Sequence, residues 1–431
     1  MNRPGQNLLS RLNFSGPQRT VSQALKGGYS TETILRLLSQ LKSGHLVMTL
    51  PNGQIREFGD KTHSLQADIQ IFNWNVFKSL ISHGDIGFAE SYIRGEWDSS
   101  DLKAILELAI RNRAILDKAI YGSWFGSIFY RVKHWLRDNS KSGSRKNIHA
   151  HYDLGNAFYS LWLDPSMSYS SAWFSEGEKQ ALGDAQRAKI SRILSSLETK
   201  PGDHILEIGC GWGGVMEEAL LSNRSITGLT LSTEQKAFAE NRLQNIKSLT
   251  NNQSRFEVRL QDYRDCQEQF DGIASVEMFE AVGERHWPEY FETLAKCLKL
   301  GGKACIQTIV IADELFERYR RNTDFIQQYV FPGGMLPSRV SFKEAAAKAG
   351  LQIKEEFAFG ADYAKTLCMW RDNFNQKLRE IRELGFDETF IRLWNFYLMY
   401  CAAGFSEKSI DVVQFTLSHS SQKASSDALT A

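Results

Sequence analysis

The stretch LEIGCGWGG, residues 206–214, decides the fold of this chain. Its first residues are apolar, as in a buried strand, and its last are dense in glycine, as in a turn that leads into a helix. Gly209 and Gly211 fit the GxG of a nucleotide-binding turn, where a missing Cβ permits unusual backbone angles and lets a ligand approach. No third glycine stands where the dinucleotide pattern GxGxxG needs it. The turn therefore favours a cofactor without a pyrophosphate.

Alternating helical and strand-like segments surround this turn. A helix is predicted over 184–197, a strand over 225–232, a helix over 233–246 and a strand over 255–263. Alternation at this spacing indicates a parallel sheet wrapped by helices, which is an α/β fold. Further helices and short strands are expected in the C-terminal third.

Polar side chains at the turn and at the ends of the predicted strands are the candidates for cofactor binding. An acidic residue and three glycines belong to the turn, and the others follow the next two strands, where a ribose and an adenine amine would need partners. The candidates are Glu207, Gly209, Gly211, Gly213, Thr230, Ser232, Gln235, Asp262 and Tyr263. Each alone could be structural, but together with the turn they resemble the cofactor site of S-adenosylmethionine-dependent methyltransferases.

The N-terminal third has a different pattern. A capped helix over 31–43 precedes two strand-like runs around Pro51-Asn52-Gly53, and LQADIQIFN continues the β pattern. Two short helices follow, the second beginning at the capping cluster 99–101. We predict a smaller α+β accessory domain over residues 1–138, a linker over 139–147 and a catalytic domain over 148–431.

A basic, aromatic segment ends the predicted accessory domain. From Lys118 to Lys146 there are seven Lys or Arg and one Asp, a local charge of +6 in a chain of net +1, and apolar residues recur every three or four positions. Aromatic rings beside clustered positive charge suit the interface of an anionic membrane. Two interpretations stay open: a membrane-docking helix, or a helix packed on its own protein with a solvated basic face.

Composition excludes several classes of protein. The 431 residues carry 51 Lys and Arg against 50 Asp and Glu, which argues against a uniformly basic nucleic-acid binder and against a highly charged disordered chain. Six scattered cysteines without CxxC spacing, and the absence of a signal-peptide pattern at the N-terminus, favour the cytoplasm. The nine histidines show no metal-ligand spacing, so no metal site is expected.

Seven ordered motifs between about residues 145 and 415 resemble the cyclopropane-fatty-acyl-phospholipid synthase family. They are HYDLGNAFYSLWLDPSMSYSSAWF (151–174), LEIGCGWGG (206–214), GLTLSTEQ (228–235), LQDYRD (260–265), MFEAVG (278–283), YVFPGGMLPS (329–338) and FGADYAKTL (359–367). The resemblance implies a Rossmann-like methyltransferase domain. It also implies that S-adenosylmethionine donates a methylene group to the cis double bond of an acyl chain in a membrane phospholipid, giving a cyclopropane fatty acid.

The resemblance further assigns catalytic positions. Ring closure needs a base that takes a proton from the added methyl group, and in this family the base is similar to a bound bicarbonate. By position, Glu280 and Tyr363 correspond to a Glu and a Tyr that hold it, and Cys401 to a family cysteine. Tyr169 matches another functional position, and we expect it and Ser170 beside the cofactor.

The chain departs from the family pattern at three of these sites. Ser171 stands where many synthases have a cysteine, Gln307 where they have a histidine, and Ala281 where MFEHVG has a second histidine. Glutamine cannot exchange a proton near neutral pH, so the bicarbonate cage is altered. These variants look more like relatives that methylate an acyl chain. A methyl- or methylene-branched product is therefore an alternative to the ring.

A protein that binds lipid without catalysis is the alternative from a different class, although the intact glycine turn argues against it. Methylation of a nucleic acid or small molecule has little support in the sequence. We expect the protein on the inner face of the membrane as a peripheral enzyme, because no stretch approaches the ~20 apolar residues of a membrane span. Family members often dimerise, but no segment of this chain indicates an interface.

Overall fold

The computed structural model describes residues 28–115, 154–177, 179–249 and 253–420. They form two compact units, and each unit is discontinuous in sequence. The first unit combines the chain up to Arg137 with 318–332 and 370–409, and the second holds 138–317, 333–369 and the chain from Ile410 onward. The predicted linker 139–147 and the basic helix after Lys118 lie outside the described residues, so the predicted domain boundaries stay a prediction.

The first unit contains the α+β structure predicted for the N-terminal third. Its sheet has the order β2-β1-β3-β4, with β1 and β2 antiparallel around the predicted turn and β3 parallel to β1. The Asp101 carboxylate caps α4 by accepting the backbone N–H groups of Lys103 and Ala104, as the capping cluster predicts. The elements are α2 (Tyr29–Leu38), β1 (His45–Thr49), β2 (Ile55–Gly59), β3 (Gln66–Ile71), α3 (Asn75–Ile93), β4 (Trp97–Asp98), α4 (Leu102–Arg111), η4 (Ile326–Val330), α16 (Leu378–Glu383) and α17 (Glu388–Ser406).

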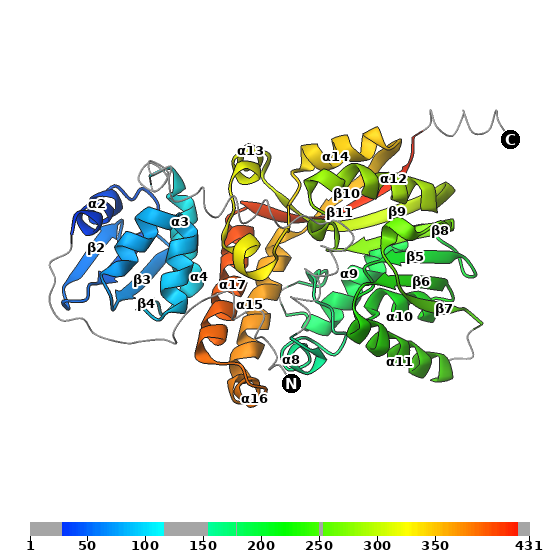
Figure 1. The fold of residues 1–431 in the computed structure, drawn as a ribbon, viewed down its shortest axis with the longest axis horizontal. Helices are drawn as coiled ribbons and strands as arrows, with labels where there is room; N and C mark the ends of the chain where they lie inside the picture. Colours follow the sequence, from blue (N-terminus) through cyan, green and yellow to red (C-terminus); the bar gives the residue numbers. More distant parts are fainter. Residues whose placement is uncertain (1–27, 116–153, 178, 250–252, 421–431) are drawn as a thin grey trace. The chain divides into compact units, whose positions relative to one another are not determined.

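The second unit is built on a seven-stranded sheet with helices on both faces (Figure 1). Its strands are β5 (His204–Ile208), β6 (Ser225–Thr230), β7 (Phe256–Leu260), β8 (Phe270–Val276), β9 (Leu298–Ile311), β10 (Leu351–Ala358) and β11 (Ile410–His419). Its helices are α8 (Asn156–Tyr159), α9 (Leu182–Ser196), α10 (Gly214–Leu221), α11 (Thr233–Leu249), η1 (Tyr263–Asp265), η2 (Phe279–Ala281), η3 (Glu284–His286), α12 (Trp287–Cys297) and α14 (Arg339–Lys348). Two further helices, α13 (Asp313–Arg321) and α15 (Gly360–Gln376), cross the boundary between the units.

The order of this sheet is β10-β11-β9-β8-β5-β6-β7. The strands from β7 to β9 are parallel, which confirms the α/β prediction, whereas β11 runs antiparallel to both of its neighbours. The carboxyl ends of β5, β6, β7 and β8 consequently share one edge of the sheet, and a ligand site is expected there.

Two apolar cores hold the helices against the sheet. On one face, Ile193 of α9 and Met216 of α10 pack with Ile205 and Ile226. All four side chains are fully buried. On the other face, Phe342 of α14 stacks on a ring of β11 with the centroids 4.2 Å apart. Among the described residues, no helix is both long and apolar enough to cross a bilayer.

Candidate active site

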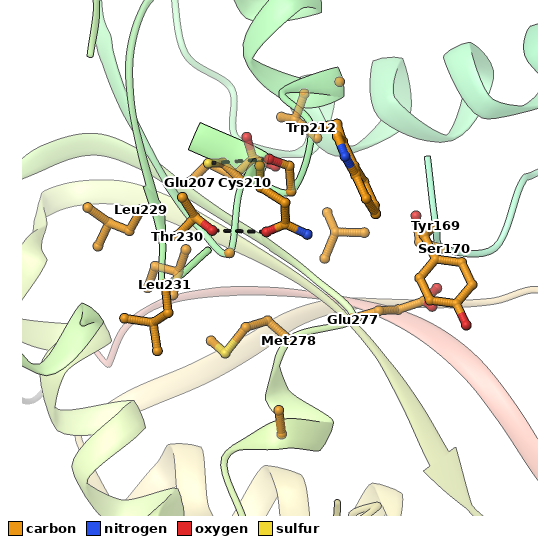
Figure 2. A pocket seen from close by; sticks show the side chains of 18 of the residues that line it. Tyr169, Ser170, Glu207, Cys210, Trp212, Leu229, Thr230, Leu231, Glu277 and Met278 are labelled. Carbon is orange, nitrogen blue, oxygen red and sulfur yellow. Dashed lines mark hydrogen bonds between the residues drawn. The ribbon is translucent and has the colours of Figure 1, made fainter. Parts of the chain in front are cut away.

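A pocket opens at the carboxyl ends of β5, β6 and β8, beside the glycine turn (Figure 2). Most of the predicted cofactor residues line it: Tyr169, Ser170, Glu207, Gly209, Gly211, Thr230, Gln235, Asp262 and Tyr263. The two others, Gly213 and Ser232, stand at the starts of α10 and α11, each next in sequence to a lining residue. The structure thus brings together residues that are up to about a hundred positions apart in sequence.

The glycine turn explains why this edge of the sheet is open. Gly209 has a φ of 84°, and a Cβ on it would lie 2.9 Å from Met278 Cγ, another lining residue. Gly211 has a φ of 52°, and no atom lies within 4 Å of where its Cβ would be. A side chain is thus excluded at Gly209, while the backbone at Gly211 can be approached by a ligand.

Glu207 is one of the acidic residues that line the pocket. It is only 3% exposed, and its Oε2 atom is buried without a hydrogen-bond partner. Burial raises the pKa of Glu207 well above its ordinary value, and the nearby Lys189 ammonium opposes that shift. An unpartnered buried carboxylate is costly, so this oxygen fits a ligand that brings a positive charge or a hydrogen-bond donor.

Thr230, Ser232 and Gln235 form one buried hydrogen-bonded group after β6. Thr230 Oγ1 donates to Gln235 Oε1 over 2.9 Å, and Ser232 Oγ accepts the backbone N–H of Gln235 over 3.3 Å. Because its amide oxygen is used in this way, Gln235 can offer its NH₂ group to a ligand hydroxyl. The sequence predicts the ribose side of the cofactor here, and that role stays a prediction.

Asp262 and Tyr263 follow β7, but the structure adds a partner that the sequence did not indicate. Both carboxylate oxygens of Asp262 accept from the Arg264 guanidinium, over 2.8 and 2.7 Å. The Tyr263 ring meets Tyr290 edge-on, with the centroids 5.4 Å apart. Asp262 is thus held in place by an arginine that also lines the pocket, and the ring of Tyr263 forms part of an aromatic wall.

Tyr169 and Ser170 close the opposite side. The Tyr169 ring lies 5.3 Å from Tyr159 and 5.7 Å from Trp162, centroid to centroid. Ser170 Oγ accepts from Lys189 Nζ over 2.5 Å. Lys189 is 1% exposed, and burial lowers its pKa to about 8, so this lysine is a buried cation in the wall of the pocket.

Three of the predicted catalytic residues converge on one side chain that the sequence analysis missed. Glu277, directly after β8, accepts the backbone N–H of Ser171 over 2.8 Å and the Gln307 Nε2 group over 2.7 Å, both at Oε1. Its Oε2 accepts the Tyr363 hydroxyl over 2.5 Å. Gln414 in turn donates to Gln307 Oε1 over 3.0 Å, which orients the amide so that its NH₂ faces the carboxylate. Glu277 lines the pocket and is labelled in Figure 2 together with Glu207 and Tyr169.

Glu280 takes a different position from Glu277. Its Oε1 atom accepts from Thr308 Oγ1 over 3.0 Å and from the backbone N–H of Ile309 over 2.5 Å, whereas its Oε2 is buried without a partner. Burial raises the pKa of Glu280 to about 8, and the charge on Glu277 adds to the shift. Glu280 therefore carries a proton near neutral pH, and its assigned role in catalysis stays a prediction.

Cys401 lies on α17 in the first unit, where burial raises the pKa of its thiol. A thiol in such surroundings is an apolar packing group rather than a nucleophile. Its predicted catalytic role also remains a prediction. No cluster of three or more metal-ligating side chains occurs in the described part of the chain.

Comparison with known proteins shows the family of this chain. Residues 139–415 match the family described as mycolic acid cyclopropane synthetase. The chain belongs to this family. It is an S-adenosylmethionine-dependent methyltransferase with a Rossmann-like fold, as the resemblance implies.

Relatives with different products are similar to this chain. It is 38% identical to the tuberculostearic acid methyltransferase UfaA1 of Mycobacterium tuberculosis, over 78% of this chain and 79% of that protein. It is 33% identical to the cyclopropane-fatty-acyl-phospholipid synthase of Escherichia coli K12, over 82% and 88%. Among solved structures, the cyclopropane synthase MmaA2 of Mycobacterium tuberculosis matches with a TM-score of 0.59 and 31% identity, over 63% of this chain and 97% of that one. The mycolic acid cyclopropane synthase CmaA1, solved with SAH and CTAB, matches with the same TM-score and 32% identity, over the same shares.

The pocket fits S-adenosylmethionine by its own chemistry. The cofactor carries an ammonium and a sulfonium, and the unpartnered oxygen of buried Glu207 is suited to a cationic donor. Gln235 and the aromatic wall at Tyr263 offer groups for the ribose and the adenine. Trp212, which also lines the pocket and donates to Asn156 Oδ1 over 2.7 Å, is a further residue that the pattern of the sequence did not single out.

Proposed function

We propose that this enzyme transfers a one-carbon unit from S-adenosylmethionine to the cis double bond of unsaturated acyl chains in membrane phospholipids. The observation that carries the proposal is the convergence of Ser171, Gln307 and Tyr363 on a carboxylate inside the cofactor pocket. An olefin that attacks the sulfonium methyl becomes a carbocation, and such a reaction needs a negative group and a proton acceptor at the reacting carbon.

The aromatic and apolar lining of the pocket supports the same chemistry. Tyr169 and Trp212 contribute aromatic rings to the lining, and such rings tolerate a cation while excluding water. Family relatives of this chain are named for products on fatty acyl chains, both in Escherichia coli and in Mycobacterium tuberculosis. A phospholipid substrate also agrees with the basic, aromatic segment after Lys118, which we propose as a peripheral contact with the inner face of the membrane.

Two products are compatible with this proposal, a cyclopropane ring and a methyl- or methylene-branched chain. Gln307 and Ser171 replace the histidine and cysteine of ring-forming relatives, and the 38% identity to a tuberculostearic acid methyltransferase points in the same direction. We therefore favour the branched product, with the ring as the second candidate.

The test is to incubate the enzyme with labelled S-adenosylmethionine and vesicles of an unsaturated phospholipid, and then to record a proton spectrum of the purified acyl methyl ester. Vinylic methylene signals support branching, and cyclopropyl resonances support the ring. A protein that binds the cofactor but labels no acyl chain would instead be a lipid-binding protein without catalysis.

A further inference from the structure

The carboxylate of Glu277 accepts three hydrogen bonds from other residues of the chain. A carboxylate has about four lone-pair positions, two on each oxygen. The Ser171 N–H and the Gln307 amide use both positions on Oε1, and the Tyr363 hydroxyl uses one on Oε2. One position on Oε2 is therefore left for a proton, on a side chain that lines the cofactor pocket.

The backbone of Glu277 has an unfavourable conformation that places its side chain in the pocket. Its φ is 50°, a left-handed conformation that is unfavourable for a non-glycine residue. The backbone N–H of Glu277 donates to the Gln307 carbonyl over 2.8 Å, so the turn and the amide side chain that orients the carboxylate are fixed by the same residue. Strain of this kind persists where the surrounding structure determines it, and it is common at active sites.

The donors to Glu277 occupy the positions that the family resemblance assigns to the bicarbonate cage. Ser171 stands at the cysteine, Gln307 at the histidine and Tyr363 at the tyrosine. A bicarbonate ion does not fit here, because its donors already bind the Glu277 carboxylate and a second anion beside that charge would be repelled.

We propose that the Glu277 carboxylate replaces bicarbonate as the catalytic base of this enzyme. This inference rests on the proposed function, since it concerns the proton that leaves after methyl transfer. Gln307 and Tyr363 act as positioning residues that aim the remaining lone pair of Oε2 into the pocket.

The step balances without another reactant. The olefin takes the methyl group of S-adenosylmethionine, the C–S bond breaks, and S-adenosylhomocysteine leaves with the electron pair. The resulting carbocation, directly or after a hydride shift, loses a proton from the transferred carbon to Glu277 Oε2. The electrons of that C–H bond then close the ring or form the methylene double bond, and Glu277 returns the proton to water.

The test compares the full-length enzyme and two variants in buffer stripped of bicarbonate and in the same buffer with bicarbonate added. The assay follows label from S-adenosylmethionine into phospholipid vesicles, and calorimetry with S-adenosylhomocysteine reports whether each variant still folds and binds. We expect wild type to react at the same rate in both buffers. Glu277→Gln, which keeps the shape of the side chain but is not basic, should lose about 100- to 10,000-fold in rate with unchanged affinity for the cofactor product.

Glu277→Ala frees the three donors, so we expect added bicarbonate to raise the rate of this variant at least about tenfold. The rate of Glu277→Gln should not change when bicarbonate is added. The inference is overturned if wild type needs added bicarbonate, or if Glu277→Gln keeps more than about a third of the wild-type rate. Failure of the proposed function has a different signature, in which wild type binds the cofactor product but labels no acyl chain in either buffer, and that result overturns both.

Discussion

Glu207 and Glu277 lie at the carboxyl ends of adjacent parallel strands, β5 and β8, yet their carboxylates have opposite surroundings. Glu207 has a buried oxygen without a partner, whereas Glu277 accepts three hydrogen bonds from its own chain. The pocket therefore contains two kinds of subsite. The part around Glu207 is completed by a ligand, and the part around Glu277 is already complete.

The first prediction tests the ligand-dependent part. Gly209→Ala places a methyl group at a φ of 84° and pushes it against Met278, which lines the pocket. We expect a loss of unfolding free energy of about 1–3 kcal/mol and a roughly 100-fold weaker binding of S-adenosylhomocysteine, measured by denaturant titration and calorimetry.

The matched control is Gly202→Ala. Gly202 also has a positive φ, of 93°, but no atom lies within 4 Å of where its Cβ would be. It should show the stability loss without the loss in affinity. Equal affinities for the two variants would contradict the role given to the Gly209 turn.

The second prediction concerns the part that is complete in itself. Gln307→Leu removes one donor to a charged group and should lower the rate of methyl transfer about 10- to 100-fold, with affinity for S-adenosylhomocysteine unchanged. Gln414→Leu is the control, because Gln414 only holds Gln307 and does not contact Glu277 in the hydrogen bonds described. Gln414→Leu should lower the rate of methyl transfer less than about threefold. A larger effect from Gln414 than from Gln307 would argue against the donor role.

The third prediction separates the two glutamates directly. Glu207→Gln removes a carboxyl that can ionise when a cationic cofactor binds beside it, and we expect about tenfold weaker binding of S-adenosylmethionine. Glu277→Gln should leave that affinity within about twofold while the rate falls. The idea of two distinct subsites fails if both variants weaken binding equally.

The last prediction concerns stability as a function of pH. The pKa of Glu280 is raised to about 8, so the folded state keeps a proton that the unfolded chain loses near pH 4.5. Since the folded state binds more protons in this window, stability should fall as pH rises from about 4.5 to 8, by at most about 1.4 kcal/mol per pH unit. Glu280→Gln should flatten the curve in urea titrations across this range. Parallel curves for variant and wild type would show that Glu280 does not hold the proton.

The sequence predicted the first of the two subsites better than the second. The glycine turn and the strand ends are local patterns, and local pattern is enough to locate Gly209, Thr230 and Asp262 at one edge of a parallel sheet. The segment VEMFEAVG, residues 276–283, contains two glutamates three positions apart. Glu277 lines the pocket and has a left-handed φ. No residue type in the segment predicts that conformation, so the sequence does not show which of the two glutamates reaches the pocket.

Lys189 was missed for a similar reason. In the sequence it is one basic residue of an ordinary helix, and most such lysines are solvated. Its burial against Ser170 is set by the packing of α9 on a segment that has no regular structure, and such packing cannot be derived from a helical pattern. Residues at strand ends could thus be found from periodicity, whereas groups that depend on tertiary burial could not.

The measurement that tests the account most directly uses S-adenosylmethionine with a fully deuterated methyl group and unsaturated phospholipid vesicles, in bicarbonate-free buffer. A base on the protein must remove one deuteron from the transferred carbon, so mass spectrometry of the acyl chain should find two of the three deuterium atoms in the product, whether ring or methylene branch. An acyl chain that retains all three, or one that gains label only after bicarbonate is added, would contradict the account.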